Sequence, residues 1–109
     1  MENFINKFKN KSRHHNKLIT FIYPELNNIE NSNILEFGVS EKAMSTELFL
    51  EHSSKTNCKL FSIDNVDYSK KFDSKNWRFL HTRDDNFSYV LDNLPTSFKL
   101  ILLDTLHEA

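Results

Sequence analysis

Acidic residues stand at or just after the ends of four short apolar runs in this chain. Glu36 closes the first run, Asp64 the second, Asp84 and Asp85 follow the third, and Asp104 closes the fourth. A carboxylate accepts hydrogen bonds from hydroxyl or amino groups, and two or more carboxylates together can hold a cation. Each acid could instead serve only in a turn or a helix cap. The recurrence at four run ends favours a shared binding edge.

The chain has a single glycine, Gly38, two positions after Glu36. It lies in "ILEFGVSEKAMST", residues 34–46, where an apolar run meets a polar stretch that can start a helix. Glycine permits positive φ and a close approach of the backbone to a ligand. This stretch therefore predicts a sharp turn from a strand into a helix, with the backbone facing a bound molecule.

The apolar runs predict four strands, at residues 34–37, 58–64, 76–82 and 98–104, because each is short and bounded by turn-forming residues. Helical segments alternate with them. This order predicts an α/β fold: a Rossmann-like parallel sheet of about four strands with flanking helices. Right-handed crossovers would bring the carboxyl ends of the strands, and with them the acids, to one edge, where such sheets bind ligands.

Helical spacing of apolar residues follows the first and third strands. One stripe consists of Ala43, Met44, Leu48 and Phe49, and the other of Phe87, Val90, Leu91 and Leu94. Asp85 or Asn86 would cap the second helix and Pro95 would stop it. A further short helix is allowed in the polar link between the second and third strands.

Residues 1–30 are expected to form a helical segment ahead of the Rossmann-like domain at 31–109. Apolar residues recur at helical spacing from Phe4 to Ile22, which predicts an amphipathic helix ending near Pro24. Its other face carries basic residues: Lys7, Lys9, Lys11, Arg13 and Lys17. This face could touch phosphates or an acidic partner, although a solvated helix face is the simpler interpretation.

The composition excludes several classes of function. A formal net charge of -1 gives no global field that would recruit nucleic acid or an anionic membrane. The one cysteine, Cys58, cannot form an intramolecular disulfide, and no secretory signal opens the chain, so a cytoplasmic setting is expected. No apolar run approaches the roughly 20 residues that cross a bilayer.

The segments "ILEFGVSEKAMST", "LFSIDN", "WRFLHTRDDNF" and "LILLDTLHEA" together resemble the amino-terminal half of a class I S-adenosylmethionine-dependent methyltransferase. The resemblance runs from about Asn33 to the end of the chain. It implies S-adenosyl-L-methionine as cofactor, a small-molecule methyl acceptor as substrate, and the first strands of a seven-stranded sheet.

The resemblance also assigns roles to the residues at the strand ends. Glu36 and Gly38 match the turn that cradles the methionine part of the cofactor, and Asp64 matches the acid that accepts hydrogen bonds from the ribose hydroxyls. Asp85 matches the acid that contacts the adenine amino group, with Asp84 as a near rival.

The ending "LLDTLHEA" is similar to members of this fold in which Asp closes the fourth strand and His follows near the acceptor. By that resemblance Asp104 would be a catalytic charge partner or a ligand of a divalent cation such as Mg²⁺, and His107 a candidate base. The other ligands of such a cation would lie beyond Ala109.

Two departures from the family pattern lead to further expectations. Ser40 and Lys42 occupy places where the family has glycine, which predicts a weaker cofactor site, although members with a following Ser-Thr pair have a sparser turn. The family sheet has seven strands and this chain offers four. The sequence therefore predicts a partial chain whose sheet is completed by a missing carboxyl-terminal half or a partner chain, because the apolar fourth strand would otherwise be an exposed edge.

There are two alternative functions. The less favoured one is a nicotinamide-dependent oxidoreductase of Rossmann type, because that fold needs G-x-G-x-x-G after the first strand and one glycine cannot supply it. A non-catalytic module with a degenerate methyltransferase fold could bind a protein or RNA through the basic first helix. Methyl transfer asks the protein mainly to align donor and acceptor, so cofactor-binding residues are easier to recognise in a sequence than catalytic ones.

Overall fold

Four strands form one parallel sheet in the computed structural model of the chain, which describes residues 17–83 and 85–103. These are β1 (Asn33–Phe37), β2 (Lys59–Asp64), β3 (Trp77–His81) and β4 (Leu100–Leu103), in the spatial order β3-β2-β1-β4. The predicted α/β fold, with a parallel sheet of four strands and flanking helices, is confirmed. Predicted and observed strands differ only at their ends.

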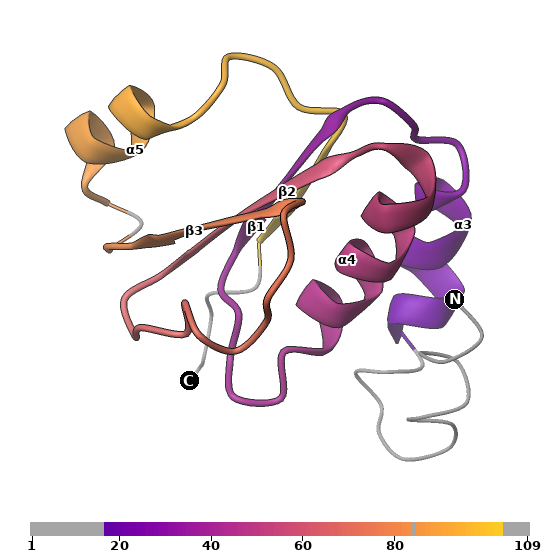
Figure 1. The fold of residues 1–109 in the computed structure, drawn as a ribbon, viewed down its shortest axis with the longest axis horizontal. Helices are drawn as coiled ribbons and strands as arrows, with labels where there is room; N and C mark the ends of the chain where they lie inside the picture. The colour runs from indigo at the N-terminus through magenta and orange to yellow at the C-terminus, as the bar shows by residue number, and fades with distance from the viewer. Residues whose placement is uncertain (1–16, 84, 104–109) are drawn as a thin grey trace.

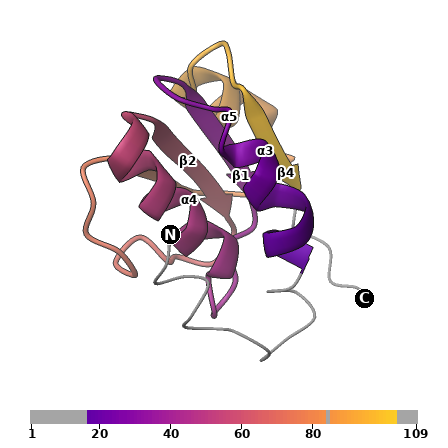
Figure 2. The same ribbon diagram turned by 90° about the vertical axis from the view of Figure 1, so that its right-hand side faces the viewer.

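Helices cover both faces of this sheet (Figure 1). α4 (Met44–Thr56) connects β1 to β2 and lies on one face, beside a helical segment made of the π-helix η1 (Leu18–Ile22) and α3 (Tyr23–Leu26) (Figure 2). α5 (Phe87–Asn93) lies on the other face, between β3 and β4 in the chain. None of the helices in the described residues has the length and apolar character that a membrane crossing requires.

The hydrophobic core is divided between the two faces, because successive side chains of a strand point to opposite sides. On the α4 face, Ile34 and Leu48 are fully buried together with Leu18 of η1. On the α5 face, Leu35 packs with Val90. Burial on both faces explains why the strands have nearly continuous apolar sequences.

The helical segment before β1 continues two residues past Pro24, the predicted stop, because Pro24 lies in the first turn of α3. Proline has no N–H to donate, so a helix tolerates it in the first turn. The turn before it is a wider π-turn, in which the Tyr23 N–H donates to the Leu18 carbonyl. The rest of the predicted amphipathic helix, with its basic residues up to Arg13, lies outside the described residues.

The ends of α4 and α5 have distinct local causes. Asn57 ends α4 with φ 58°, a left-handed conformation that Asn tolerates well. Asn86, one of the two residues predicted to cap α5, is at the N-cap position, but its side chain makes no capping bond. α5 ends at Asn93, and the next residue, Leu94, is extended as expected for a residue before proline. The link at residues 65–76 contains no helix, so the short helix allowed there is not formed.

β4 is an edge strand whose apolar side chains are only half covered. Leu100 and Leu102 pack against the core on the α4 face, whereas Ile101 and Leu103 are 54% and 73% exposed on the other face. β4 pairs with β1 on one side, and no described strand pairs with its other side. Such an edge is open to pairing with another polypeptide.

Replacing Ile101 and Leu103 together by lysine is expected to reduce self-association of the chain, because charge at an open strand edge prevents pairing. Stability should change little, since both side chains are exposed. Sedimentation velocity over a range of concentrations measures the association.

The matched control is Leu102→Lys, on the same strand but packed against the core. It should lower the free energy of unfolding by about 1–3 kcal/mol. Equal association of the wild type and the double variant would contradict a role for this edge.

Candidate functional site

The carboxyl ends of the strands gather the candidate site at one edge of the sheet. The β1–α4 loop (residues 38–43) follows β1, Asp64 ends β2, and residues 82–86 follow β3. The chain runs outward from β1 to β3 and then returns to β4, so strand order reverses between β1 and β4. In open α/β sheets, ligands bind beside the strand ends at such a reversal.

The β1–α4 loop turns through three residues with positive φ. Gly38 has φ 100°, Ser40 67° and Ala43 51°. The Gly38 N–H donates to the Ile63 carbonyl at 2.8 Å, which holds the turn against β2. The single glycine therefore stands where the backbone must turn sharply. Of the two places where the resemblance to methyltransferases would lead us to expect glycine, Ser40 adopts the left-handed conformation and Lys42 does not.

Asp64 holds this loop from the side. Its Oδ2 accepts the backbone N–H of Val39 at 2.8 Å and that of Ser40 at 3.5 Å, and its Oδ1 accepts the N–H of Val66 at 3.0 Å. The structure thus brings together two predicted site residues, Gly38 and Asp64. A carboxylate can accept about four hydrogen bonds, so this half-buried group retains acceptor capacity for a ligand.

Glu36 lies beneath the loop, fully buried on the α4 face. Its Oε1 accepts the hydroxyls of Thr46 at 2.6 Å and Ser62 at 2.7 Å, and its Oε2 accepts the hydroxyl of Ser45. The indole N–H of Trp77 donates to the Ser62 hydroxyl at 2.8 Å. This buried network joins β1, β2, β3 and the first turn of α4.

The buried position of Glu36 allows it to fix the local structure. Its carboxylate is surrounded by hydroxyl donors and lies by the amino end of α4, where the helix dipole stabilises negative charge. It therefore fixes the start of α4, and with it the shape of the β1–α4 loop. Neither Ser62 nor Trp77 was predicted from the sequence as part of this network. The available signal was a serine inside the apolar run "LFSID", at a strand position that must be buried.

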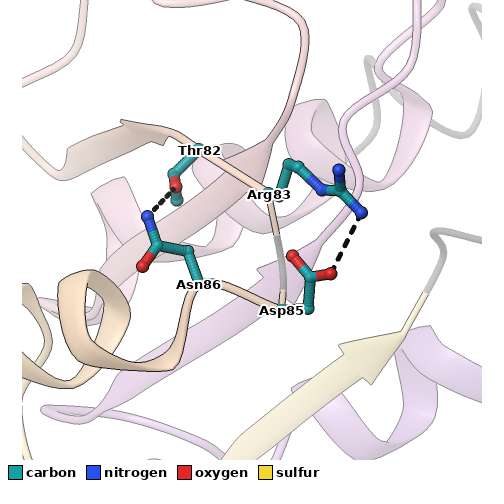
Figure 3. A network of polar contacts seen from close by, with 4 residues as sticks. All are labelled: Thr82, Arg83, Asp85 and Asn86. Carbon is teal, nitrogen blue, oxygen red and sulfur yellow. Dashed lines mark hydrogen bonds and ion pairs between the residues drawn. The ribbon is translucent and has the colours of Figure 1, made fainter.

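The loop after β3 carries Asp85 at the surface (Figure 3). Asp85 Oδ2 forms an ion pair with Arg83 Nη2 at 3.0 Å, with side chains 58% and 74% exposed. Asn86 donates from Nδ2 to the Thr82 hydroxyl at 3.2 Å. Exposed ion pairs contribute little to stability, so Asp85 is held only loosely. Asp84 lies outside the described residues.

Asp67, in the link after β2, is an exposed acid with a lowered pKa. The Ser69 hydroxyl, and then the Ser69 backbone N–H at 3.0 Å, donate to its carboxylate and lower the pKa. Because the pKa is lower in the folded state, the stabilisation is present above the ordinary value. It is lost as the pH falls through the lowered value.

The catalytic and metal candidates Asp104 and His107 lie outside the described residues. Among residues 17–83 and 85–103, no three His, Cys, Asp or Glu side chains are grouped closely enough to hold a metal ion. Comparisons of the chain with families of known proteins, with curated proteins and with solved structures give no match.

Ser62→Ala is expected to lower the free energy of unfolding by about 1–3 kcal/mol. The change removes one donor to Glu36 and leaves the Trp77 indole N–H without its acceptor. Urea denaturation followed by tryptophan fluorescence measures it. Ser54→Ala, at an exposed position of α4, is the control and should change stability little. Equal effects of the two variants would show that the network does not stabilise the fold.

Ser40→Gly and Lys42→Gly form a matched pair in the β1–α4 loop. The left-handed conformation costs a residue with a Cβ roughly 1–2 kcal/mol, so glycine at Ser40 relieves a penalty that offsets the added flexibility of the unfolded chain. Lys42 has no such penalty, and glycine there should cost about 0.5–1 kcal/mol. Thermal unfolding should find Ser40→Gly the more stable variant, and the reverse order would contradict the loop conformation.

Proposed function

We propose that this chain is an S-adenosylmethionine-binding domain of methyltransferase type that acts on a small-molecule acceptor. The observation that carries the proposal is the β1–α4 loop. It turns at Gly38 with positive φ and is held by Asp64, at the carboxyl edge of a parallel sheet. Ligand sites of this fold class lie beside the strand-order reversal.

The residues at this edge suit the chemical groups of the cofactor. Asp64 has acceptor capacity left for ribose hydroxyls, and the exposed Asn65 lies beside it. Ser40 and Lys42 are exposed in the loop, where a hydroxyl and an ammonium group can bind the carboxylate of the methionine part. The two residues that replace family glycines thus add donors where glycine would offer backbone alone.

Asp85 is the candidate for the adenine amino group. Its ion pair with Arg83 uses Oδ2, which leaves Oδ1 for a further donor. The exposed pair can be rearranged at small cost when a ligand binds. Glu36 would contribute to cofactor binding indirectly, because its buried carboxylate positions the β1–α4 loop.

The acceptor side of the site would be completed by a further polypeptide segment. Such a segment would pair with the side of β4 that no described strand occupies, and would cover Ile101 and Leu103. When bound, the cofactor supplies an electrophilic methyl group, and the protein aligns the acceptor with it. Asp104 would be the charge partner or Mg²⁺ ligand and His107 the base.

Isothermal titration calorimetry with S-adenosyl-L-methionine tests the proposal. Asp64→Asn keeps an oxygen that can accept a loop N–H but removes the charge, so affinity should fall roughly ten- to a hundredfold. Asp73→Asn, an equal charge change at an exposed position of the following link, should bind as the wild type does. A folded wild type that releases no heat with the cofactor, or an Asp64→Asn variant that binds equally well, would refute the proposal.

A further inference from the structure

An open groove lies at the amino ends of the strands, at the opposite edge of the sheet from the β1–α4 loop. Its volume is about 540 Å³. Its lining consists of three asparagines, two serines, Phe98 and two lysines, Lys59 and Lys99. None of the described residues that line it is an acid. The part of the lining that the structure describes therefore offers cationic and amide groups.

Backbone pairing places both lysines next to Asn33. Asn33 is the register partner of Lys59 on β2, and the Lys99 backbone N–H donates to the Asn33 carbonyl at 2.9 Å. Side chains in register across a sheet point to the same face, so Lys59 and Asn33 lie on one face. Lys99 stands just before β4, and its side chain lines the same groove.

The amide groups in the groove are already oriented by hydrogen bonds. Asn57 donates from Nδ2 to Asn31 Oδ1 at 3.1 Å, and Asn33 donates from Nδ2 to the Ser97 carbonyl at 3.2 Å. Each amide nitrogen has two N–H groups, so one remains on each for another acceptor. A ligand in the groove would meet preplaced donors.

The two lysines of the groove have no ion-pair partner among the described residues. Neither Lys59 nor Lys99 pairs with a carboxylate of residues 17–83 or 85–103, and the ion pair in that part of the chain joins Arg83 and Asp85 in the loop after β3. Two ammonium groups in one groove repel each other, and an anion bound between them attracts both. A ligand with two or more negative charges can bind both ammonium groups at once, whereas a single carboxylate carries only one charge.

We propose that this groove binds a small molecule that carries two or more phosphate groups. Lys59 and Lys99 would each bind one phosphate, and the remaining N–H of Asn33 would donate to the oxygens between them. Phe98, fixed edge-on against Phe61 with ring centroids 5.9 Å apart, supplies an apolar wall for the organic part of the ligand. The site is separate from the proposed cofactor site, and neither depends on the other.

Calorimetry with inorganic pyrophosphate and with ADP, in a chloride buffer free of phosphate, tests this inference. The wild type should bind both, and Lys59→Gln/Lys99→Gln should weaken binding at least about tenfold. Lys70→Gln/Lys75→Gln makes the same charge change at exposed positions of the link after β2, and should weaken binding less than about twofold. Circular dichroism establishes that each variant is folded.

Asn33→Asp gives a second, independent arm, because it places a carboxylate between the two lysines. Pyrophosphate binding should be lost while the chain stays folded. Absence of pyrophosphate binding by the wild type, or equal loss in both lysine pairs, would overturn the inference. Tighter binding of single-stranded RNA than of ADP, sensitive to the same lysines, would overturn the assignment to a small molecule.

Discussion

The buried carboxylate of Glu36 is the interaction on which the rest of the site depends. A charged or polar group in the core is tolerated only when hydrogen-bond donors surround it. Here Ser45 and Thr46 provide donors from the first turn of α4, and Ser62 provides one from β2. Trp77 extends the network to β3. Three strands and one helix are thereby held in fixed positions around one group, and the loop between β1 and α4 has little freedom left.

The carboxyl edge of the sheet follows from that constraint. Glu36 holds the loop from beneath and Asp64 holds it from the side, through the N–H groups of Val39 and Ser40. Gly38 makes the turn that both contacts require. A single glycine is enough because Ser40 and Ala43 adopt the other left-handed conformations of the loop. The glycine-poor loop is therefore compatible with an ordered ligand site.

Much of the fold, and part of the site, could be predicted from sequence. Short apolar runs located the strands, and the rule that strand ends gather in a parallel sheet correctly placed Gly38 and Asp64 at one edge. The hydroxyl partners of Glu36 were not predictable, since they become donors to it only after packing. Lys59 and Lys99 were not singled out for a similar reason. They are far apart in the chain and reach one groove only because β2 and β4 both pair with β1.

A titration of the ¹⁵N-labelled chain tests most directly whether the carboxyl edge around Gly38 and Asp64 is a cofactor site. The ligand is S-adenosyl-L-homocysteine, the product form of the cofactor, and the readout is the amide chemical shifts. We expect saturable shifts in residues 38–42 and 64–66, with little change at Asn33 and Lys59. No shift at saturating ligand, or shifts confined to the amino ends of the strands, would contradict it.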